Sequence, residues 1–285
     1  MPERRYYSIR TGRRPGGVQL DLPTFKRLFL SLYSDLDEEG WFQEAFGFEC
    51  VDSGMVFGAL GRDVRGEVLL ALRKDDLWPV RSWIDNYSED DLFDVIEFLF
   101  DYVSFPTKRD YHDWNQCGWH CSEFDPIRGK ATYREKINRL LNEYSAGFEL
   151  SEQGEVLRLG DDGLRPLLAA KLPDGADEAN VRNRVDAAVL KFRRHSATSE
   201  DRRDALRDLA DVLEYLRPEV REVLEEKDEA DLFNLANNFG IRHHNAKQKT
   251  RYDKAIWYSW SFYYYLATIH ASLHLLERKP GSSRS

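Results

Sequence analysis

Residues able to handle a phosphodiester lie close together near the C-terminal end of this sequence. The stretch 237–245 holds one arginine, two adjacent histidines and three asparagines, and its candidate catalytic residues are Arg242, His243 and His244. An arginine guanidinium binds anionic oxygens through parallel N–H donors, and an imidazole exchanges protons near neutral pH. This combination of side chains is typical of a site that binds or cuts a sugar-phosphate chain.

Basic residues extend this segment. Residues 241–254 carry five positive charges against one negative, a local balance of +4 in a chain whose total is −9. Because clustered Lys and Arg side chains attract phosphates, we expect RNA or phosphate contacts on this segment. The predicted contacts are Asn238, Asn245, Lys247, Lys249 and Arg251.

Metal-independent RNA cleavage needs a base for the 2′-hydroxyl proton, an acid for the leaving 5′-oxygen, and a cation for the charge on the phosphorane. His243 or His244 suits the base or the acid, since an unperturbed imidazole titrates at about 6.5. Arg242 suits the cation. We expect Asp211 and Glu214, on the preceding helix, to orient an imidazole or to pair with Arg242.

A structural interpretation of the same residues stays open. The asparagines and Gly240 are ordinary turn residues, and Arg242 can tie two helices together through Asp211 or Glu214. The two histidines are then surface or helix-terminal residues. The sequence does not choose between His243 and His244.

A second group of chemically capable residues lies in the middle of the chain. His112, Cys117, His120 and Cys121 are all zinc-ligand types and fall within ten residues. Their spacing is poor, however, because adjacent His120 and Cys121 point apart in most backbones and no second Cys-x-x-Cys pair follows. The neighbouring tryptophans favour a packed aromatic loop, so we expect no metal and no other cofactor.

The length and composition of the chain limit which classes of protein it can belong to. The chain has 285 residues, 42% of them hydrophobic, which is enough for one large or two ordinary cored domains. Three cysteines do not make a disulfide framework, and neither a signal peptide nor a membrane span is visible. We therefore expect a cytoplasmic protein without membrane partners, and the overall acidity argues against non-specific DNA coating.

The N-terminal half reads as α+β. Apolar periodicity predicts helices over 23–39, 89–104 and 131–145, and a small β-hairpin over 148–159. The stretch 66–75 is ambiguous between strand and helix. Residues 106–130, rich in Pro, Gly, Asp and aromatics, read as loop.

Residues 160–163 form the best domain boundary, and everything after them reads as helix. The predicted helices cover about 177–195, 199–216, 219–238 and 251–278, with Ser199 as an N-cap and Pro218 as a stop. Short loops between long helices predict an antiparallel bundle. The last helix has a core row from Ala255 to Leu276 and further apolar residues on other faces, which suggests dimerisation through this half. The predicted class is thus mainly α.

At this point the sequence resembles a known family. The helical half, with Arg and His before its last long helix, resembles a HEPN bundle, and the N-terminal half resembles the domain paired with it in AbiJ-type abortive infection proteins. The phrases that carry the resemblance are Tyr7–Gly12, Leu92–Leu99, Cys117–His120 with Phe124-Asp125, and Gly147–Glu155. The resemblance implies an AbiJ-like domain over 1–160 and a HEPN-like bundle over 161–285.

The resemblance also implies a use. Many HEPN proteins are metal-independent endoribonucleases that act as toxins in phage defence, with two bundles pairing so that both active sites line one cleft. We therefore expect an antiphage, toxin-like endoribonuclease with RNA as substrate, a homodimeric state and a phage or host trigger. The family motif places four to six residues between Arg and His, whereas here Arg242 directly precedes His243. The alternative is a non-catalytic HEPN-like module that binds RNA, a nucleotide or a protein.

Overall fold

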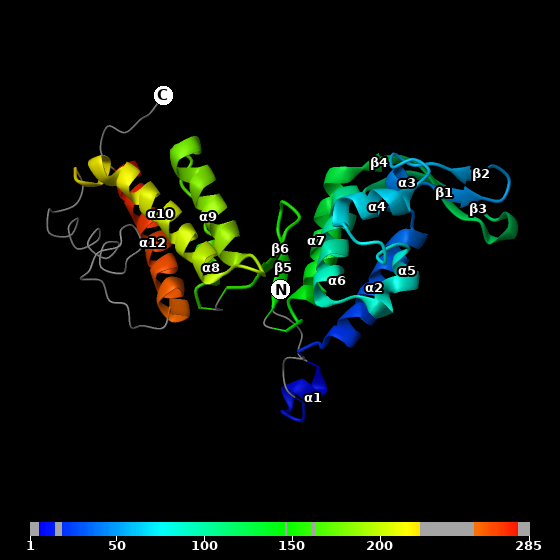
Figure 1. Cartoon of the computed structure of the whole chain (residues 1–285), viewed down its shortest axis with the longest axis horizontal. Helices are drawn as coiled ribbons and strands as arrows, with labels where there is room; N and C mark the ends of the chain where they lie inside the picture. Colours follow the sequence, from blue (N-terminus) through cyan, green and yellow to red (C-terminus); the bar gives the residue numbers. More distant parts are fainter. Residues whose placement is uncertain (1–5, 15–18, 146, 161–162, 223–253, 279–285) are drawn as a thin grey trace. The chain divides into compact units, whose positions relative to one another are not determined.

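The computed structural model describes residues 6–14, 19–145, 147–160, 163–222 and 254–278. The chain divides into two compact units, residues 1–158 and 159–285 (Figure 1). Each unit has a hydrophobic core of its own. The two units are therefore described separately.

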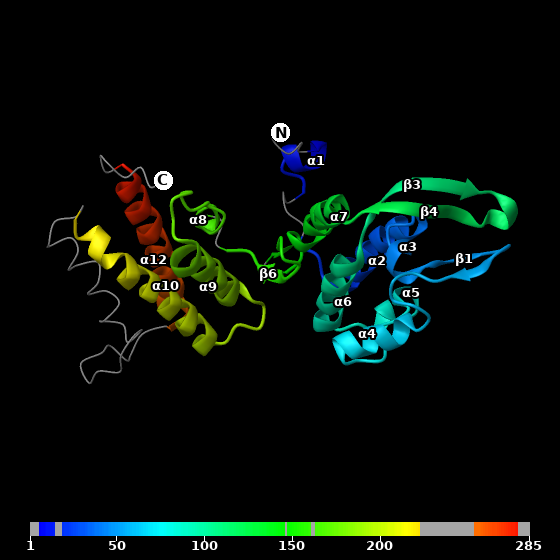
Figure 2. The ribbon, with the colours of Figure 1, turned by 90° about the horizontal axis from the view of Figure 1, so that it is seen from above.

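Three helices carry the core of the N-terminal unit. They are α2 (Leu22–Glu38), α6 (Glu89–Tyr102) and α7 (Pro126–Leu141), and Figures 1 and 2 show them packed together. In α2 the Asp21 side chain accepts the Thr24 N–H at 2.9 Å, and Phe25 and Phe29 are fully buried one turn apart. The predicted helix over 23–39 rested on apolar residues at helical spacing after Pro23 and is confirmed, and the Asp21 cap adds the signal that starts it one residue earlier.

The central helix α6 begins with a reciprocal cap. Ser88 Oγ accepts the Asp91 N–H, and the Asp91 carboxylate accepts the Ser88 N–H. Lys74 Nζ forms a salt bridge with the same Asp91 carboxylate at 2.7 Å. The cap satisfies N–H groups that the first turn of a helix leaves without partners, so this start is well defined. The predicted helix over 89–104 is confirmed.

Shorter elements complete the helical part of this unit. They are α1 (Tyr7–Arg10), α3 (Gln43–Phe46), α4 (Val64–Leu72), α5 (Val80–Trp83) and the 3-10 turn η1 (Ile84–Asn86). The ambiguous stretch 66–75 is helical as far as Leu72, and the Asp63 side chain caps this helix by accepting the Gly66 N–H. Arg73, the residue after the helix, takes a left-handed conformation with φ of 59°.

Three separate antiparallel hairpins make up the sheet content of the described residues. They are β1 (Phe48–Cys50) with β2 (Gly54–Val56), β3 (Phe105–His112) with β4 (Gly118–Asp125), and β5 (Phe148–Leu150) with β6 (Val156–Arg158). The hairpin predicted over 148–159 is confirmed. The predicted loop over 106–130 is wrong, because it contains β3, β4, the 3-10 turn η2 (Trp114–Gln116) and the start of α7.

The reason for that error is the exposure of the β3–β4 hairpin. Residues 107–111 of β3 are all exposed and mostly polar, so no apolar alternation marks a buried face. Backbone pairing holds the two strands instead, with Tyr111 opposite Trp119 and His112 opposite Gly118. A ribbon of this kind has no hydrophobic signature for sequence reasoning to detect.

The described part of the C-terminal unit is helical. It contains α8 (Arg165–Leu168), the π-helical turn η3 (Glu178–Arg182), α9 (Asn183–Arg193), α10 (Ser199–Val220) and α12 (Lys254–Glu277). Figures 1 and 2 show α9 and α10 antiparallel, as their short connection predicts, whereas α10 and α12 lie side by side and run in the same direction. The predicted helix over 219–238 lies, beyond residue 222, outside the described residues.

Two details of α10 differ from the prediction. Thr198, and not Ser199, is the N-cap: its Oγ1 accepts the Asp201 N–H, and the Asp201 carboxylate accepts the Thr198 N–H. The helix also continues through Pro218 to Val220. A proline within the last turn removes only a hydrogen bond near the helix end, which limits its cost.

Helix α12 buries a broader face than the predicted row. Phe262, Leu266, Ile269 and Leu273 are buried as predicted, and a second row of buried residues lies beside them. That second row consists of Tyr258, Ser261, Tyr265 and Ser272. Stacking of Phe192 of α9 on Phe262, with ring centroids 3.9 Å apart, joins α12 to the rest of the core.

The mainly α class is confirmed, since helices dominate both units and each hairpin has only two strands. Among the described residues, no helix combines the length and the apolar character that a membrane span requires.

Candidate functional site

The predicted catalytic and RNA-binding residues cannot be placed. Arg242, His243 and His244 lie outside the described residues, and so do the phosphate contacts predicted between Asn238 and Arg251. Of the supporting residues, Asp211 is exposed on α10 and Glu214 is half-buried one turn later. Glu214 pairs with Arg217 of the same helix at 3.3 Å.

The structure brings a different set of chemically capable side chains together. Cys50, His112, Cys117 and His120 place one sulfur or ring nitrogen each within 4.8 Å of all the others. We call these four residues the Cys/His cluster. It lies between the tips of the β1–β2 and β3–β4 hairpins, which extend from the same end of the N-terminal unit (Figures 1 and 2).

Two distances within the cluster are near those of a four-coordinate site. Cys50 Sγ lies 3.9 Å from His112 Nδ1, and Cys117 Sγ lies 3.2 Å from His120 Nε2. In a tetrahedron with ligand bonds of about 2.0–2.3 Å, neighbouring donor atoms lie about 3.3–3.8 Å apart. Both distances lie just outside this range, and all four donor atoms lie within 4.8 Å of one another.

Cys50 is held by the turn that follows it. The residue ends β1 and is buried. Backbone hydrogen bonds from Ser53 and then Asp52 lower the pKa of the Cys50 thiol, and side-chain hydrogen bonds from Ser53 and Cys117 act in the same direction. Stabilising the thiolate makes this sulfur a better metal ligand or nucleophile.

His112 is oriented by a carboxylate. Its Nε2 lies 3.2 Å from Asp52 Oδ2. With the proton on Nε2, the ring donates to Asp52 and directs the lone pair of Nδ1 toward Cys50 Sγ. Carboxylates fix metal-binding histidines in this way. The ring of the second histidine of the cluster, His120, packs against Phe48 of β1 with ring centroids 4.5 Å apart.

The turn before β4 has an unusual backbone. Asn115 and Gln116 have φ values of 51° and 56°, and Gly118 has a φ of 97°. Side-chain-bearing residues rarely occupy this region, and such conformations persist where surrounding structure enforces them. The turn places Cys117 so that its Sγ lies 3.7 Å from the backbone oxygen of Glu49 on the other hairpin.

The cluster includes three of the four candidate ligands named from the sequence. Cys121 lies elsewhere: its Sγ is 4.0 Å from the backbone oxygen of Glu39, and its N–H donates to Gln43 Oε1. Burial raises the pKa of the Cys121 thiol. Neighbouring side chains on a strand point to opposite faces, so only His120 of this pair faces the cluster.

Sequence reasoning missed Cys50, because 61 residues separate it from His112. The available signal was local: a cysteine followed by Val51-Asp52-Ser53-Gly54 sits at the start of a tight turn. Sequence reasoning also favoured a packed aromatic loop here. Trp114 is 71% exposed, so that tryptophan does not pack the hairpin tip.

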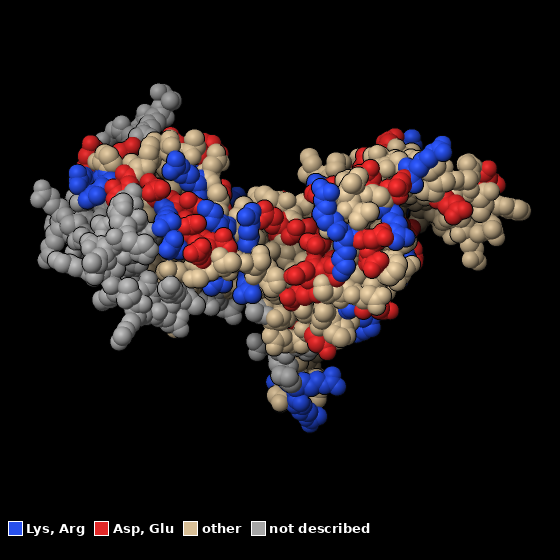
Figure 3. Space-filling view, in the orientation of Figure 1, with Lys and Arg blue, Asp and Glu red and all other residues tan. Residues whose placement is uncertain are grey.

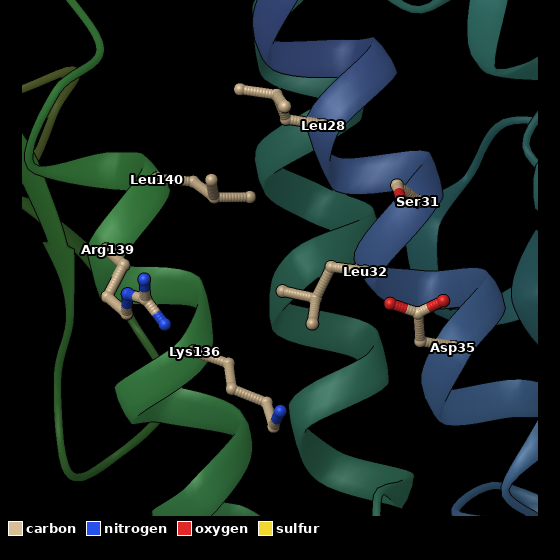
Figure 4. A pocket seen from close by; sticks show the side chains of 7 residues that line it. All are labelled: Leu28, Ser31, Leu32, Asp35, Lys136, Arg139 and Leu140. Carbon is tan, nitrogen blue, oxygen red and sulfur yellow. The ribbon is translucent and has the colours of Figure 1, made fainter.

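A second concave feature lies between α2 and α7 (Figure 4). Its lining residues are Leu28, Ser31, Leu32, Asp35, Lys136, Arg139 and Leu140. Leu28 and Leu32 line it from α2 and Leu140 from α7, and the Asp35 carboxylate of α2 lies across from the two basic side chains of α7. It contains no histidine and no cysteine, so it offers neither a proton-transfer group of neutral pKa nor a soft metal ligand.

The charges on the described surface are mixed. On the face drawn in Figure 3, Lys and Arg alternate with Asp and Glu over the helices of the C-terminal unit. A broad basic area of the kind that coats nucleic acid is not present on that described face.

A scan against protein-family models, a search of curated proteins and a search of solved structures each find no match to this chain. The resemblance to HEPN and AbiJ-type proteins therefore rests on the sequence phrases that carry it.

Proposed function

We propose that this chain is a metal-independent endoribonuclease whose active residues are Arg242 and one of the two adjacent histidines. The observation that carries the proposal is the Arg242-His243-His244 sequence inside a segment with a charge balance of +4. The resemblance to the HEPN family adds the context of a toxin-like protein in phage defence, released by a phage or host trigger.

The proposed reaction is a transesterification. One imidazole takes the proton of a ribose 2′-hydroxyl, whose oxygen attacks the adjacent phosphorus. The P–O5′ bond breaks, and a protonated imidazole or water supplies the proton to the leaving oxygen. Arg242 binds the non-bridging oxygens, where charge grows in the transition state. The products are a 2′,3′-cyclic phosphate and a 5′-hydroxyl.

The setting of the segment supports this assignment. It joins α10 to α12, which pack side by side in a helical unit of HEPN-like size. Asp211 and Glu214 lie on α10, as the proposal requires of residues that support the site from a neighbouring helix. Asn238, Asn245, Lys247, Lys249 and Arg251 are the proposed phosphate contacts.

A surface of α12 supports the homodimer in the proposal. Opposite its buried face, α12 carries a row without charges at spacings of three and four residues: Trp257, Trp260, Tyr264, Ala267, Ala271 and Leu275. Trp260 is 42% exposed and Leu275 40%. Trp260 stacks on Tyr264 with centroids 5.4 Å apart. Exposed apolar rows of this kind mark interaction surfaces, and a second copy of the helix fits the HEPN pairing.

One observation favours a second candidate. Arg242 and His243 are adjacent, whereas the family motif separates them by four to six residues. A bundle that binds RNA without cutting it would keep the basic segment and lose the motif spacing.

The test compares cleavage and binding of labelled RNA by wild-type protein and by Arg242→Ala. In buffer without added metal ions, we expect wild-type cleavage with cyclic-phosphate ends and a loss of at least about 100-fold in Arg242→Ala, typical for removal of a transition-state donor. Arg184→Ala, an exposed arginine on α9, is the matched control. Binding without cleavage by the wild-type protein would support the second candidate instead.

A further inference from the structure

We propose that Cys50, His112, Cys117 and His120 bind one Zn²⁺ in a closed tetrahedral site that joins the tips of the β1–β2 and β3–β4 hairpins. The four donor atoms lie within 4.8 Å of one another. All four positions are filled by the protein, which is the arrangement of structural zinc sites and leaves no open position for a substrate. The site is independent of the proposed nuclease.

The donor set selects the metal. Two thiolates and two imidazoles in a tetrahedron favour Zn²⁺, whereas Mg²⁺ and Ca²⁺ require oxygen ligands. Iron–sulfur clusters are held by four cysteines in most proteins, and the chain has only three. Zinc is also redox-inert, which suits a site whose role is to hold two turns together.

The cluster extends beyond the four ligands. Asp52 lies 3.2 Å from the ring nitrogen of His112 that does not face the cluster. Backbone hydrogen bonds in the Val51–Ser53 turn act on the Cys50 sulfur. Outer groups of this kind orient the ligands of metal sites. The cluster therefore has an orienting carboxylate at His112 and hydrogen-bond donors at Cys50 in addition to its four ligand side chains. Chance proximity of two cysteines and two histidines does not explain these additional groups.

The described hairpin tips bury little apolar surface, and few side-chain contacts join them, among them the ring contact of Phe48 with His120 and the pair of His112 with Asp52. Every residue of β2 is exposed, and so are large apolar side chains at the tips, among them Val51, Met55 and Trp114. The two hairpins form separate sheets. A two-stranded hairpin without a packed face is marginal in water, so a metal bridge between the tips supplies what a hydrophobic core does not.

Zinc binding releases protons from the two cysteine ligands. When Zn²⁺ binds, the thiols of Cys50 and Cys117 lose their protons to water, and His112 and His120 bind through Nδ1 and Nε2 as neutral rings. The site then carries two negative thiolates against the divalent cation. Binding therefore weakens as pH falls and the ligands protonate.

The test is metal analysis of the full chain purified under reducing conditions without chelators. We expect one zinc per chain by elemental mass spectrometry, released when a mercurial modifies the thiols. Replacement with Co²⁺ should give the intense visible absorption of a tetrahedral ion and a thiolate-to-cobalt band. Metal-free protein whose intact mass is two hydrogens lower, and whose peptide map joins Cys50 to Cys117, would show a disulfide between the two ligands and would overturn the proposal.

Variants separate the site from adventitious metal. Cys50→Ser and Cys117→Ser should each lose the thiolate band and most of the bound zinc, while Cys121→Ser, from the same hairpin, should keep both. If the ligand variants do not fold, the Co²⁺ titration of wild-type protein still decides, because only sulfur ligation gives the charge-transfer band. Equal metal loss from all three variants, or no zinc in wild-type protein, would contradict the assignment.

Discussion

His112 and Asp52 form a pair in which Nε2 of the ring lies 3.2 Å from Oδ2 of the carboxylate. The other ring nitrogen of His112 faces the Cys50 sulfur at 3.9 Å. Asp52 belongs to the turn after β1 and His112 to the end of β3. The pair therefore links the two hairpins from outside the Cys/His cluster and fixes which nitrogen of His112 faces inward.

Replacing Asp52 with Asn should weaken zinc binding without abolishing it. Loss of an outer-shell carboxylate typically costs about 10–100-fold in metal affinity, because the histidine is less firmly oriented and less basic. Competition with a chromophoric chelator measures the change. Glu123→Gln, an exposed carboxylate on β4 that pairs with Lys108, is the matched control. Equal affinities for Asp52→Asn and wild-type protein would remove Asp52 from the site.

Glu97 predicts a pH-dependent stability in the N-terminal unit. Its Oε1 accepts the Val156 N–H at 2.6 Å. Burial, followed by the charges of Glu155, Asp94 and Asp101, raises the pKa of the Glu97 carboxyl above its usual 4.5. A raised folded-state pKa gives stability that is present below pH 4.5 and is lost as pH rises through the folded-state value.

Glu97→Gln keeps an oxygen acceptor for Val156 and removes the half-buried charge. We expect its melting temperature to exceed that of the wild type at pH 7.5, and the gap to close at about pH 4, where the wild-type carboxyl is protonated. Differential scanning calorimetry at both pH values checks this. Glu135→Gln, on the exposed face of α7, should show no such gap. A difference in melting temperature that widens at low pH would mean that the pKa of Glu97 is lowered by folding and not raised.

Thr198 rather than Ser199 should control the start of α10. Removing the Oγ1 acceptor of an N-cap costs about 1 kcal/mol, or about fivefold in a local opening equilibrium. Hydrogen–deuterium exchange in the first turn of α10 should therefore be faster in Thr198→Ala by roughly that factor. Ser199→Ala should exchange as the wild type does. The reverse order would show that the sequence-based assignment of Ser199 was right.

The uncharged row on α12 predicts the oligomeric state. A charge at Trp260 has to be desolvated when two copies pair, so Trp260→Glu should shift the proposed dimer toward monomer. Light scattering across a dilution series gives the mass of each species. Trp114→Glu, an equally large change at an exposed tryptophan of the N-terminal unit, should leave the dimer intact. A wild-type protein that is monomeric at all concentrations would exclude this surface as a dimer interface.

The sequence predicted the helices well where local signals carry the structure. For α2 and α6, caps at Asp21 and Ser88 precede apolar residues at helical spacing, and both signals lie within a few residues of each other. Helix α7 was predicted to start at 131, five residues late, because its N-cap Asp125 and Pro126 were read as part of a loop. The β3–β4 hairpin was missed because its strands are exposed and paired through the backbone. Such a ribbon has no apolar period, and its turn contains left-handed residues, Asn115 and Gln116, that are not glycines.

The Cys/His cluster could not be assembled from local sequence signals either. Cys117 and His120 are three residues apart, so a local reading can name them. Cys50 joins them only because two hairpins separated by 48 residues of chain approach at their tips. No short-range rule encodes that approach. The residues proposed for RNA cleavage are known from the sequence alone, since they lie outside the described residues.

Cleavage of an RNA that carries a single 2′-deoxy substitution tests the central claim most directly. The cleavage position is first mapped on all-ribose RNA, and the nucleotide 5′ to it is then replaced by its deoxy form. If the 2′-oxygen is the nucleophile, wild-type protein cuts the all-ribose RNA and leaves the substituted bond intact. Equal cleavage of both substrates, or no cleavage of the all-ribose RNA, would contradict the account.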